Sequence, residues 1–211
     1  MLRSVLDQGI HAAVAWVVGL LLAVAVHEFA HARAAHALGD STAADEGRMT
    51  LNPFKHLSLW GTLFLLFFGL GWSEPVPVDP RNFRQPRRDG LLTAFAGPAS
   101  NLAVAGALGV LAQFLPLDSR LPALVATMIF VNCLLAFFNL IPIPPLDGSS
   151  ILPYFFPQQP FFLLRLQQQG VLILLLLILA DSVFQGRVLG TLVLLPARFF
   201  TSVFLGAPLG L

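Results

Sequence analysis

The sequence predicts an all-α polytopic membrane protein, a helix bundle of about four to six transmembrane segments with a re-entrant segment at 57–71. Two observations favour this fold class. Of the 211 residues, 56% are hydrophobic and only 11% are charged, whereas a soluble domain carries about 25% charged residues. The apolar residues also gather in long stretches without charges, and the mean hydropathy is +0.79. We therefore expect most of the chain to lie in lipid.

Stretches without charged residues place the spans along the chain, since a crossing helix needs about 20 apolar residues. No residue from Gln8 to His27 is formally charged, and the alanine-rich helical pattern continues until Gly39 offers a natural stop. We therefore expect the first helix at 8–38. The further expected spans, each uncharged or strongly apolar, are 90–117, 121–146, the stretch between Arg165 and Asp181, and the tail 188–208.

The stretch 57–71 is apolar but short and rich in glycine. Segments of about 10–14 apolar residues more often bury in protein or re-enter the membrane than cross it. Basic residues flank this stretch on both sides, and the positive-inside rule assigns both flanks to the cytoplasm. They are Arg33, Arg48 and Lys55 before it, and Arg81, Arg84, Arg87 and Arg88 after it. A re-entrant hairpin or half-helix satisfies the rule, whereas a single crossing does not.

The same charge pattern sets the direction of the helices. The first helix then runs from outside to inside, 90–117 runs outward and 121–146 returns. The ionisable cluster at 27–31 therefore lies in the cytoplasmic half of the first helix. Asp147, just after the third span, arrives at a similar depth on the same side.

His27, Glu28 and His31 spell the pattern H-E-x-x-H within the first helix. Residues four apart share a helix face, so the two imidazoles can bind one zinc ion at about 2.0–2.1 Å. Glu28 lies beside this face and can take a proton from a zinc-bound water. A catalytic zinc needs a third protein ligand, and Asp147 is the best candidate by depth. A satisfied helix end at the interface and an ordinary Asp-Gly turn are the alternative explanations.

The other histidines and the cysteine fit a site less well. His11 lies at the exterior end of the first helix, and His36 faces another direction from His31. His56 lies beside the re-entrant stretch, where a polar surface role is favoured. Cys133 is the single cysteine, so no internal disulfide can form, and it lies in an apolar run typical of a core side chain.

Several longer motifs extend this pattern. The string "HEFAH" is followed about a hundred residues later by "NLIPIPPLDG" at 139–148, and "LNPFKH", "GWSEPVPVDPRNFR" and "AGPASN" lie between them. In this order they resemble the site-2 protease family of intramembrane zinc metalloproteases. The resemblance is to the short bacterial and archaeal branch, which consists of little more than the catalytic core.

The resemblance implies a role for each residue of the candidate site. His27, His31 and Asp147 would bind Zn²⁺, and Glu28 would be the catalytic base. Asn139 would point toward the site, where its amide could contact the substrate or the developing oxyanion. A helix-capping or interhelical hydrogen bond explains Asn139 about equally well.

We therefore expect residues 1–211 to form a single membrane-embedded metalloprotease domain. It would hydrolyse a peptide bond in or near the transmembrane segment of a membrane-protein substrate, as in regulated intramembrane proteolysis. The expected location is the plasma (inner) membrane of a prokaryote, as a multi-pass protein whose active site opens toward the cytoplasm. Its partners would be the substrate and the lipid bilayer; the net charge of +1 gives no basic field for nucleic acid.

Two alternatives stay open. One is a catalytically inactive or metal-binding membrane protein of the same fold, against which the intact Glu28 argues, because binding metal requires no base. The other is a membrane zinc peptidase of another family. Such a peptidase would carry a second acidic or histidine cluster on a later helix, where the sequence offers only Asp181.

Overall fold

The computed structural model describes residues 9–68, 71–116, 121–156, 158, 161–183 and 186–206. Within these ranges, five helical segments are long and apolar enough to cross a membrane. They are α2 (Ile10–Ala37), α5 (Pro86–Ala112), α6 (Leu121–Asn139), α8 (Phe161–Val183) and the run of α9 (Arg187–Leu189), η4 (Gly190–Leu194, π-helical) and α10 (Leu195–Leu205). The described residues contain no strand beyond one isolated bridge, so the predicted all-α polytopic bundle is confirmed.

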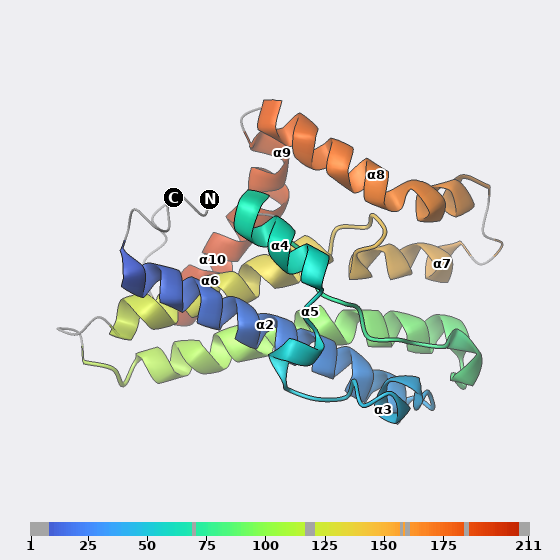
Figure 1. Cartoon of the computed structure of the whole chain (residues 1–211), viewed down its shortest axis with the longest axis horizontal. Coiled ribbons are helices and arrows are strands. Elements are labelled where there is room, and N and C mark those ends of the chain that lie inside the picture. The colour runs from blue at the N-terminus through green and yellow to red at the C-terminus, as the bar shows by residue number, and fades with distance from the viewer. Residues whose placement is uncertain are drawn as a thin grey trace.

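The centre of the bundle consists of α2, α5 and α6, with α10 packed against α5 and α6 (Figure 1). Small residues lie at the contacts, among them Gly19 and Ala23 on α2 and Ala105 and Gly109 on α5. A Cβ atom at Gly109 would lie 2.4 Å from the carbonyl oxygen of Phe204 on α10. Helices associate in lipid chiefly through close packing, so these small residues let the backbones approach.

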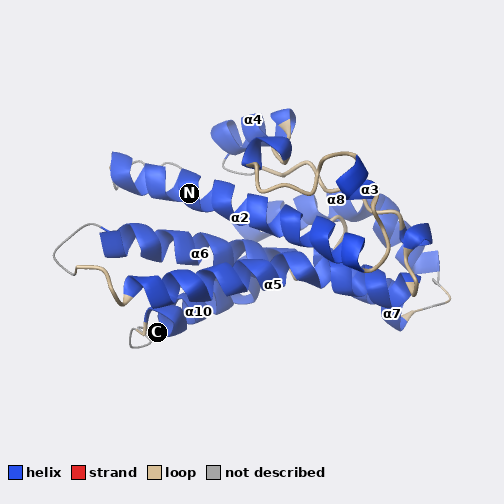
Figure 2. Cartoon of the chain, turned by 90° about the horizontal axis from the view of Figure 1, so that it is seen from below, coloured by secondary structure: helices blue, strands red, loops and turns tan. Residues whose placement is uncertain are grey.

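The predicted re-entrant stretch contains one short helix, α4 (Leu59–Phe68), on the opposite side of α2 from α5 (Figure 2). After this helix the backbone comes back beside the residues that precede it. Leu57 and Ser73 form an antiparallel bridge, and the backbone N–H of Glu74 donates to the carbonyl oxygen of His56 at 2.8 Å. Residues 69 and 70 lie outside the described part of the chain. The paired ends agree with a hairpin that enters and leaves on one side.

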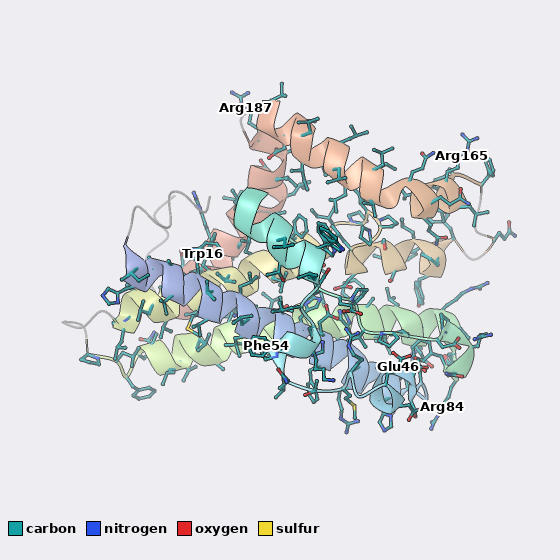
Figure 3. The ribbon with its side chains drawn as sticks, viewed as in Figure 1. Trp16, Glu46, Phe54, Arg84, Arg165 and Arg187 are labelled. Atoms are coloured by element: carbon teal, nitrogen blue, oxygen red, sulfur yellow. The ribbon has the colours of Figure 1, made fainter. Side chains whose placement is uncertain are left out.

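The connections around this hairpin are short helical turns. They are α3 (Thr42–Asp45), η1 (Pro53–Lys55) before the hairpin and η2 (Pro80–Asn82) after it. Figure 3 shows Glu46, Arg84 and Arg165 at one end of the molecule, whereas Trp16 lies toward the other end. Arg84, and Arg87 and Arg88 in the first turn of α5, therefore lie at the end where α2 finishes, whereas Phe54, next to Lys55, lies midway along the molecule.

The helix α6 ends at Asn139, although the uncharged stretch continues to residue 146. Three prolines in this interval explain the early end, because proline has no backbone N–H and interrupts a helix. Asp147 then opens a 3-10 turn, η3 (Asp147–Ser150), which leads into α7 (Ile151–Phe155). The break places Asp147 on a loop instead of a transmembrane helix.

Candidate metal centre

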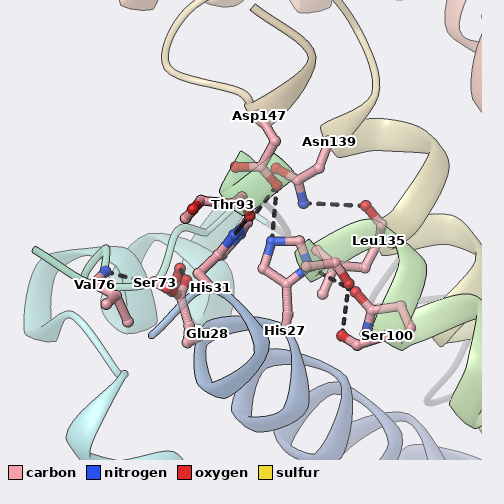
Figure 4. Close-up of polar contacts among 12 residues, drawn as sticks. His27, Glu28, His31, Ser73, Val76, Thr93, Ser100, Leu135, Asn139 and Asp147 are labelled. Carbon is pink, nitrogen blue, oxygen red and sulfur yellow. Dashed lines mark hydrogen bonds and ion pairs between the residues drawn. The ribbon is translucent and has the colours of Figure 1, made fainter. Parts of the chain in front are cut away.

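His27 and His31 lie one turn apart on the buried face of α2, and both rings point toward Asp147 (Figure 4). The two ring centroids are 4.6 Å apart. The helix spacing brings the imidazoles together, as the sequence pattern predicts. The turn at the end of α6 adds the carboxylate from a distant part of the chain.

The helix α5 holds the outer nitrogen of each ring. His31 Nδ1 lies 2.7 Å from the backbone carbonyl oxygen of Thr93, and His27 Nδ1 lies 2.7 Å from Asn101 Oδ1. Both partners are acceptors, so each Nδ1 carries the proton and donates it. In a neutral imidazole the other nitrogen, Nε2, then carries a lone pair and can act as a ligand or an acceptor. Such outer hydrogen bonds orient metal-binding histidines in known sites.

The two Nε2 atoms face one oxygen of Asp147. Asp147 Oδ2 lies 3.0 Å from His27 Nε2 and 3.3 Å from His31 Nε2, yet it is buried and has no hydrogen-bond partner. Three lone pairs therefore converge and require a cation or an added proton among them. Tetrahedral ligands about 2.0–2.1 Å from zinc lie about 3.3 Å from one another. The donor set and its spacing fit zinc.

Gly97 brings the backbone of α5 close to both rings. A Cβ atom at this position would lie 2.4 Å from His31 Nε2 and 2.7 Å from His27 Cε1. Only a glycine leaves room for the two imidazoles here. The "AGPASN" motif therefore forms one wall of the centre through Gly97.

Glu28 points away from the three ligand atoms, toward the segment that leaves the hairpin. Ser73 Oγ donates to Glu28 Oε1 at 2.6 Å, and the backbone N–H of Val76 donates to Oε2 at 3.2 Å (Figure 4). The carboxylate is buried with its residue only 5% exposed. The hairpin and the H-E-x-x-H helix are thus joined through the residue expected to be the base.

Asn139 is the last residue of α6, and Figure 4 shows it beside Asp147. Its side-chain nitrogen donates to the carbonyl oxygen of Leu135, one turn earlier in the same helix, at 3.1 Å. The amide nitrogen of Asn139 is therefore occupied by a hydrogen bond within its own helix. The position next to Asp147 agrees with the expectation that Asn139 points toward the site.

The other histidines lie elsewhere. Among the described residues, His27, His31 and Asp147 form the one group of three ligand-type side chains close enough to share a metal. His11 and His36 are exposed. His56 is fully buried instead of lying at a polar surface, and its Nε2 donates to the carbonyl oxygen of Thr50 at 2.8 Å.

Several contacts of the site have no signal in the sequence. The carbonyl of Thr93 and the N–H of Val76 are backbone groups that every residue carries. Ser73 becomes a partner of Glu28 only through the fold of the hairpin. Asn132 is a buried amide of α6 and belongs to none of the motifs. Its position as a polar residue within a long apolar run is the signal by which the sequence could have indicated it.

Comparisons with known proteins agree with this chemistry. A family model described as peptidase family M50 matches residues 116–180, which include Asp147. The candidate zinc metalloprotease YwhC of Bacillus subtilis is 40% identical over 64% of this chain and 66% of its own length. The candidate zinc metalloprotease Rip2 of Mycobacterium tuberculosis is 34% identical over 79% of this chain and 67% of its own length.

A cyanobacterial relative extends the match further along the chain. The candidate zinc metalloprotease sll0528 of Synechocystis is 30% identical over 90% of this chain but only 45% of its own length. This chain thus spans about two thirds of YwhC and Rip2, and less than half of sll0528. No solved structure matches the chain.

Proposed function

Because the chain belongs to peptidase family M50, the site-2 protease family, we propose that it cleaves a membrane-protein substrate in or near a transmembrane segment. The observation that carries this proposal is the convergence of three ligand atoms, His27 Nε2, His31 Nε2 and Asp147 Oδ2. Bound zinc supplies a Lewis acid that polarises the scissile carbonyl and lowers the pKa of a coordinated water. His27, His31 and Asp147 would hold it with one position open.

Glu28 is the proposed general base. It directly follows His27, so its backbone lies beside the ligand face of α2. In the resting arrangement Ser73 and Val76 hold its carboxylate. Glu28 would take a proton from the attacking water and pass it to the leaving amine. This requires the carboxylate to turn from the 73–76 segment toward the site when a substrate is bound.

Asn139 is the proposed contact for the substrate. Its amide lies beside Asp147 at the end of α6, where an extended substrate backbone would approach the open position. An amide at this place can bind the peptide carbonyl or the oxyanion that develops from it. Substrate access also requires local unwinding of the substrate helix, because its peptide groups are otherwise bonded to one another.

We propose the cytoplasmic face of a prokaryotic plasma membrane as the side from which the site opens. The basic residues that follow the hairpin, Arg84, Arg87 and Arg88, lie at the end of the bundle where α2 finishes and α5 begins, and His31 lies near this end of α2. Excess Lys and Arg mark the cytoplasmic side of membrane proteins. The similar proteins named above are bacterial. We extend the proposal to a role in regulated intramembrane proteolysis, carried out by a single membrane-embedded domain.

The test compares Glu28→Gln with the same substitution at Glu46, an exposed residue of the loop after α2. Each purified, zinc-loaded protein is incubated with isotope-labelled bacterial membranes solubilised in mild detergent, and new amino termini are mapped by mass spectrometry. We expect termini inside or beside transmembrane segments with wild type and Glu46→Gln. They should be lost with Glu28→Gln, although this variant keeps its zinc. Equal cleavage by Glu28→Gln would overturn the assignment.

A further inference from the structure

Asn132 is a fully buried amide in the middle of α6, a helix that is otherwise almost entirely apolar. Polar side chains inside a membrane helix are costly unless they are bonded, and they commonly serve a function. Asn132 belongs to no motif of the sequence and touches none of the proposed ligands. Its role must therefore be sought in its hydrogen bonds.

These bonds lead from α6 to the metal centre. Asn132 Oδ1 accepts from Asn101 Nδ2 at 3.1 Å, and Asn101 Oδ1 accepts from His27 Nδ1 at 2.7 Å. Both asparagines are fully buried. We call Asn132 and Asn101 the amide relay. It connects three helices, α6, α5 and α2, through side chains alone.

Two backbone carbonyls fix the direction of every bond in the amide relay. The amide nitrogen of Asn132 donates to the carbonyl oxygen of Met128 at 2.9 Å, so its oxygen must face Asn101. The amide nitrogen of Asn101 donates to the carbonyl oxygen of Ala23 at 2.9 Å as well as to Asn132. The oxygen of Asn101 is thereby left to face His27. A carbonyl accepts only, so neither amide can flip without losing a bond.

We infer that Asn132 is a positioning residue that sets the tautomer of His27 through Asn101, and this inference rests on the proposed zinc site. With Oδ1 of Asn101 facing it, Nδ1 of His27 carries the proton and Nε2 is free to bind metal. Without Asn132, one N–H group of Asn101 has no acceptor. The amide of Asn101 is then held less firmly in its present orientation. A flipped Asn101 would present N–H groups to Nδ1, which would favour the Nε2–H tautomer that cannot bind zinc.

His31 provides an internal contrast. Its Nδ1 donates directly to the backbone carbonyl of Thr93, which no side chain orients. The tautomer of His31 should therefore be independent of the amide relay. Any effect of Asn132 on the site should appear at His27 and spare His31.

The first test is zinc affinity, measured by competition with a chromophoric chelator, for the full chain in detergent. Loss of an outer partner commonly lowers metal affinity by about 10–100-fold, which we expect for Asn101→Ala. Asn132→Ala should lower it by a smaller factor, about 3–10-fold, because Asn101 keeps its bond to Ala23. Cys133→Ala is the matched control, since Cys133 is the next residue, equally buried and remote from the site.

The double variant separates positioning from packing. If Asn132 acts only through Asn101, the variant lacking both amides should bind zinc no more weakly than Asn101→Ala alone. Asn132→Asp should restore most of the affinity in its protonated form, which keeps an acceptor for Asn101 and a donor for Met128. Additive losses, or equal losses in Asn132→Ala and Cys133→Ala, would overturn the inference while leaving the zinc site in place.

The second test does not need zinc. In metal-free protein with ¹⁵N-labelled histidine, the ring nitrogens of His27 are assigned by their loss in His27→Gln. Wild type should show a proton on Nδ1 of His27, bonded to Asn101. Asn132→Ala should show a mixture of rings with and without this proton, with Nδ1 of His31 unchanged. An unchanged His27 in Asn132→Ala would contradict the inference. A wild type that shows Nδ1–H but never binds zinc would instead overturn the proposed function.

Discussion

The two halves of the metal centre are held by different means. His27 and His31 lie on one continuous helix, and hydrogen bonds of 2.7 Å from α5 fix the outer nitrogen of each ring. Their side chains are 6% and 10% exposed, against 21% for Asp147. Asp147 lies on a loop, and its inward oxygen has no hydrogen-bond partner. The histidine half is therefore oriented by hydrogen bonds to a neighbouring helix, whereas the polar contacts of Asp147 Oδ2 are with the two histidines themselves.

Close backbone packing holds the aspartate half. A Cβ atom at Gly148 would lie 2.3 Å from the carbonyl oxygen of Leu140, and one at Gly170 on α8 would lie 2.3 Å from that of Pro144. Both glycines let the loop that carries Asp147 fold against neighbouring backbone. One site thus combines two ligands oriented by hydrogen bonds to another helix with a third ligand positioned by the backbone packing of its loop.

The largest effect should come from breaking the histidine half at Gly97. The methyl group in Gly97→Ala would overlap both imidazoles, so the rings or α5 must move. We expect zinc affinity to fall by about 100-fold, the upper end of effects seen outside the ligands themselves. Chelator competition measures it. Gly106→Ala on the same helix is the control, because its methyl group would meet Phe204 at an ordinary 3.5 Å; equal affinities in both variants would contradict the proposed packing.

A smaller effect is expected in the aspartate half from Gly148→Ala. The added methyl group would push the loop from Leu140 and move the carboxylate, and we expect about a 10-fold loss of zinc affinity. The Nδ1 signals of His27 and His31 in the metal-free protein should stay unchanged, since their acceptors lie on α5, whereas the Nε2 signals face the carboxylate that moves. Gly190→Ala, whose methyl group would meet nothing within 4 Å, is the control. Shifted Nδ1 signals would show that the halves are not independent.

The smallest effect concerns Asp40, which anchors the loop after α2 with polar contacts. Burial acts to raise the pKa of this carboxyl, but hydrogen bonds from Asn82, Thr42 and the N–H of Asp79 outweigh it and hold the pKa below its usual value. The stabilisation is therefore present above the unfolded pKa of about 3.9 and lost as pH falls through the folded pKa.

Thermal unfolding in detergent at stepped pH tests this anchor. Between pH 5 and the acid limit of folding, the Tm of wild type should fall by more than the Tm of Asp40→Asn, because only the wild type loses this stabilisation as the carboxyl is protonated. The asparagine cannot titrate, so the difference isolates Asp40 from the histidines. Parallel curves for the two proteins would contradict the account.

The sequence predicted the histidine half better than the aspartate half. Helical periodicity alone places His27 and His31 on one face, and the charge pattern alone indicates the hairpin at 57–71. Without the family resemblance, Asp147 is indicated only by its depth and its place at a helix end, because no spacing rule relates a loop to a distant helix. The partners of Glu28 could not be predicted, since the return of the hairpin brings Ser73 and Val76 to it. The bond between Asn101 and His27 could not be predicted either, because it depends on the tertiary crossing of α2 and α5.

The central claim is that the two halves bind one zinc ion together. The most direct measurement is the metal content of purified protein in detergent, by elemental mass spectrometry, for wild type, Asp147→Ala and the exposed control Asp45→Ala. We predict about one zinc per chain in wild type and in Asp45→Ala, and a sharp loss in Asp147→Ala. Wild type that stays empty after zinc is supplied, or zinc unchanged in Asp147→Ala, would contradict the account.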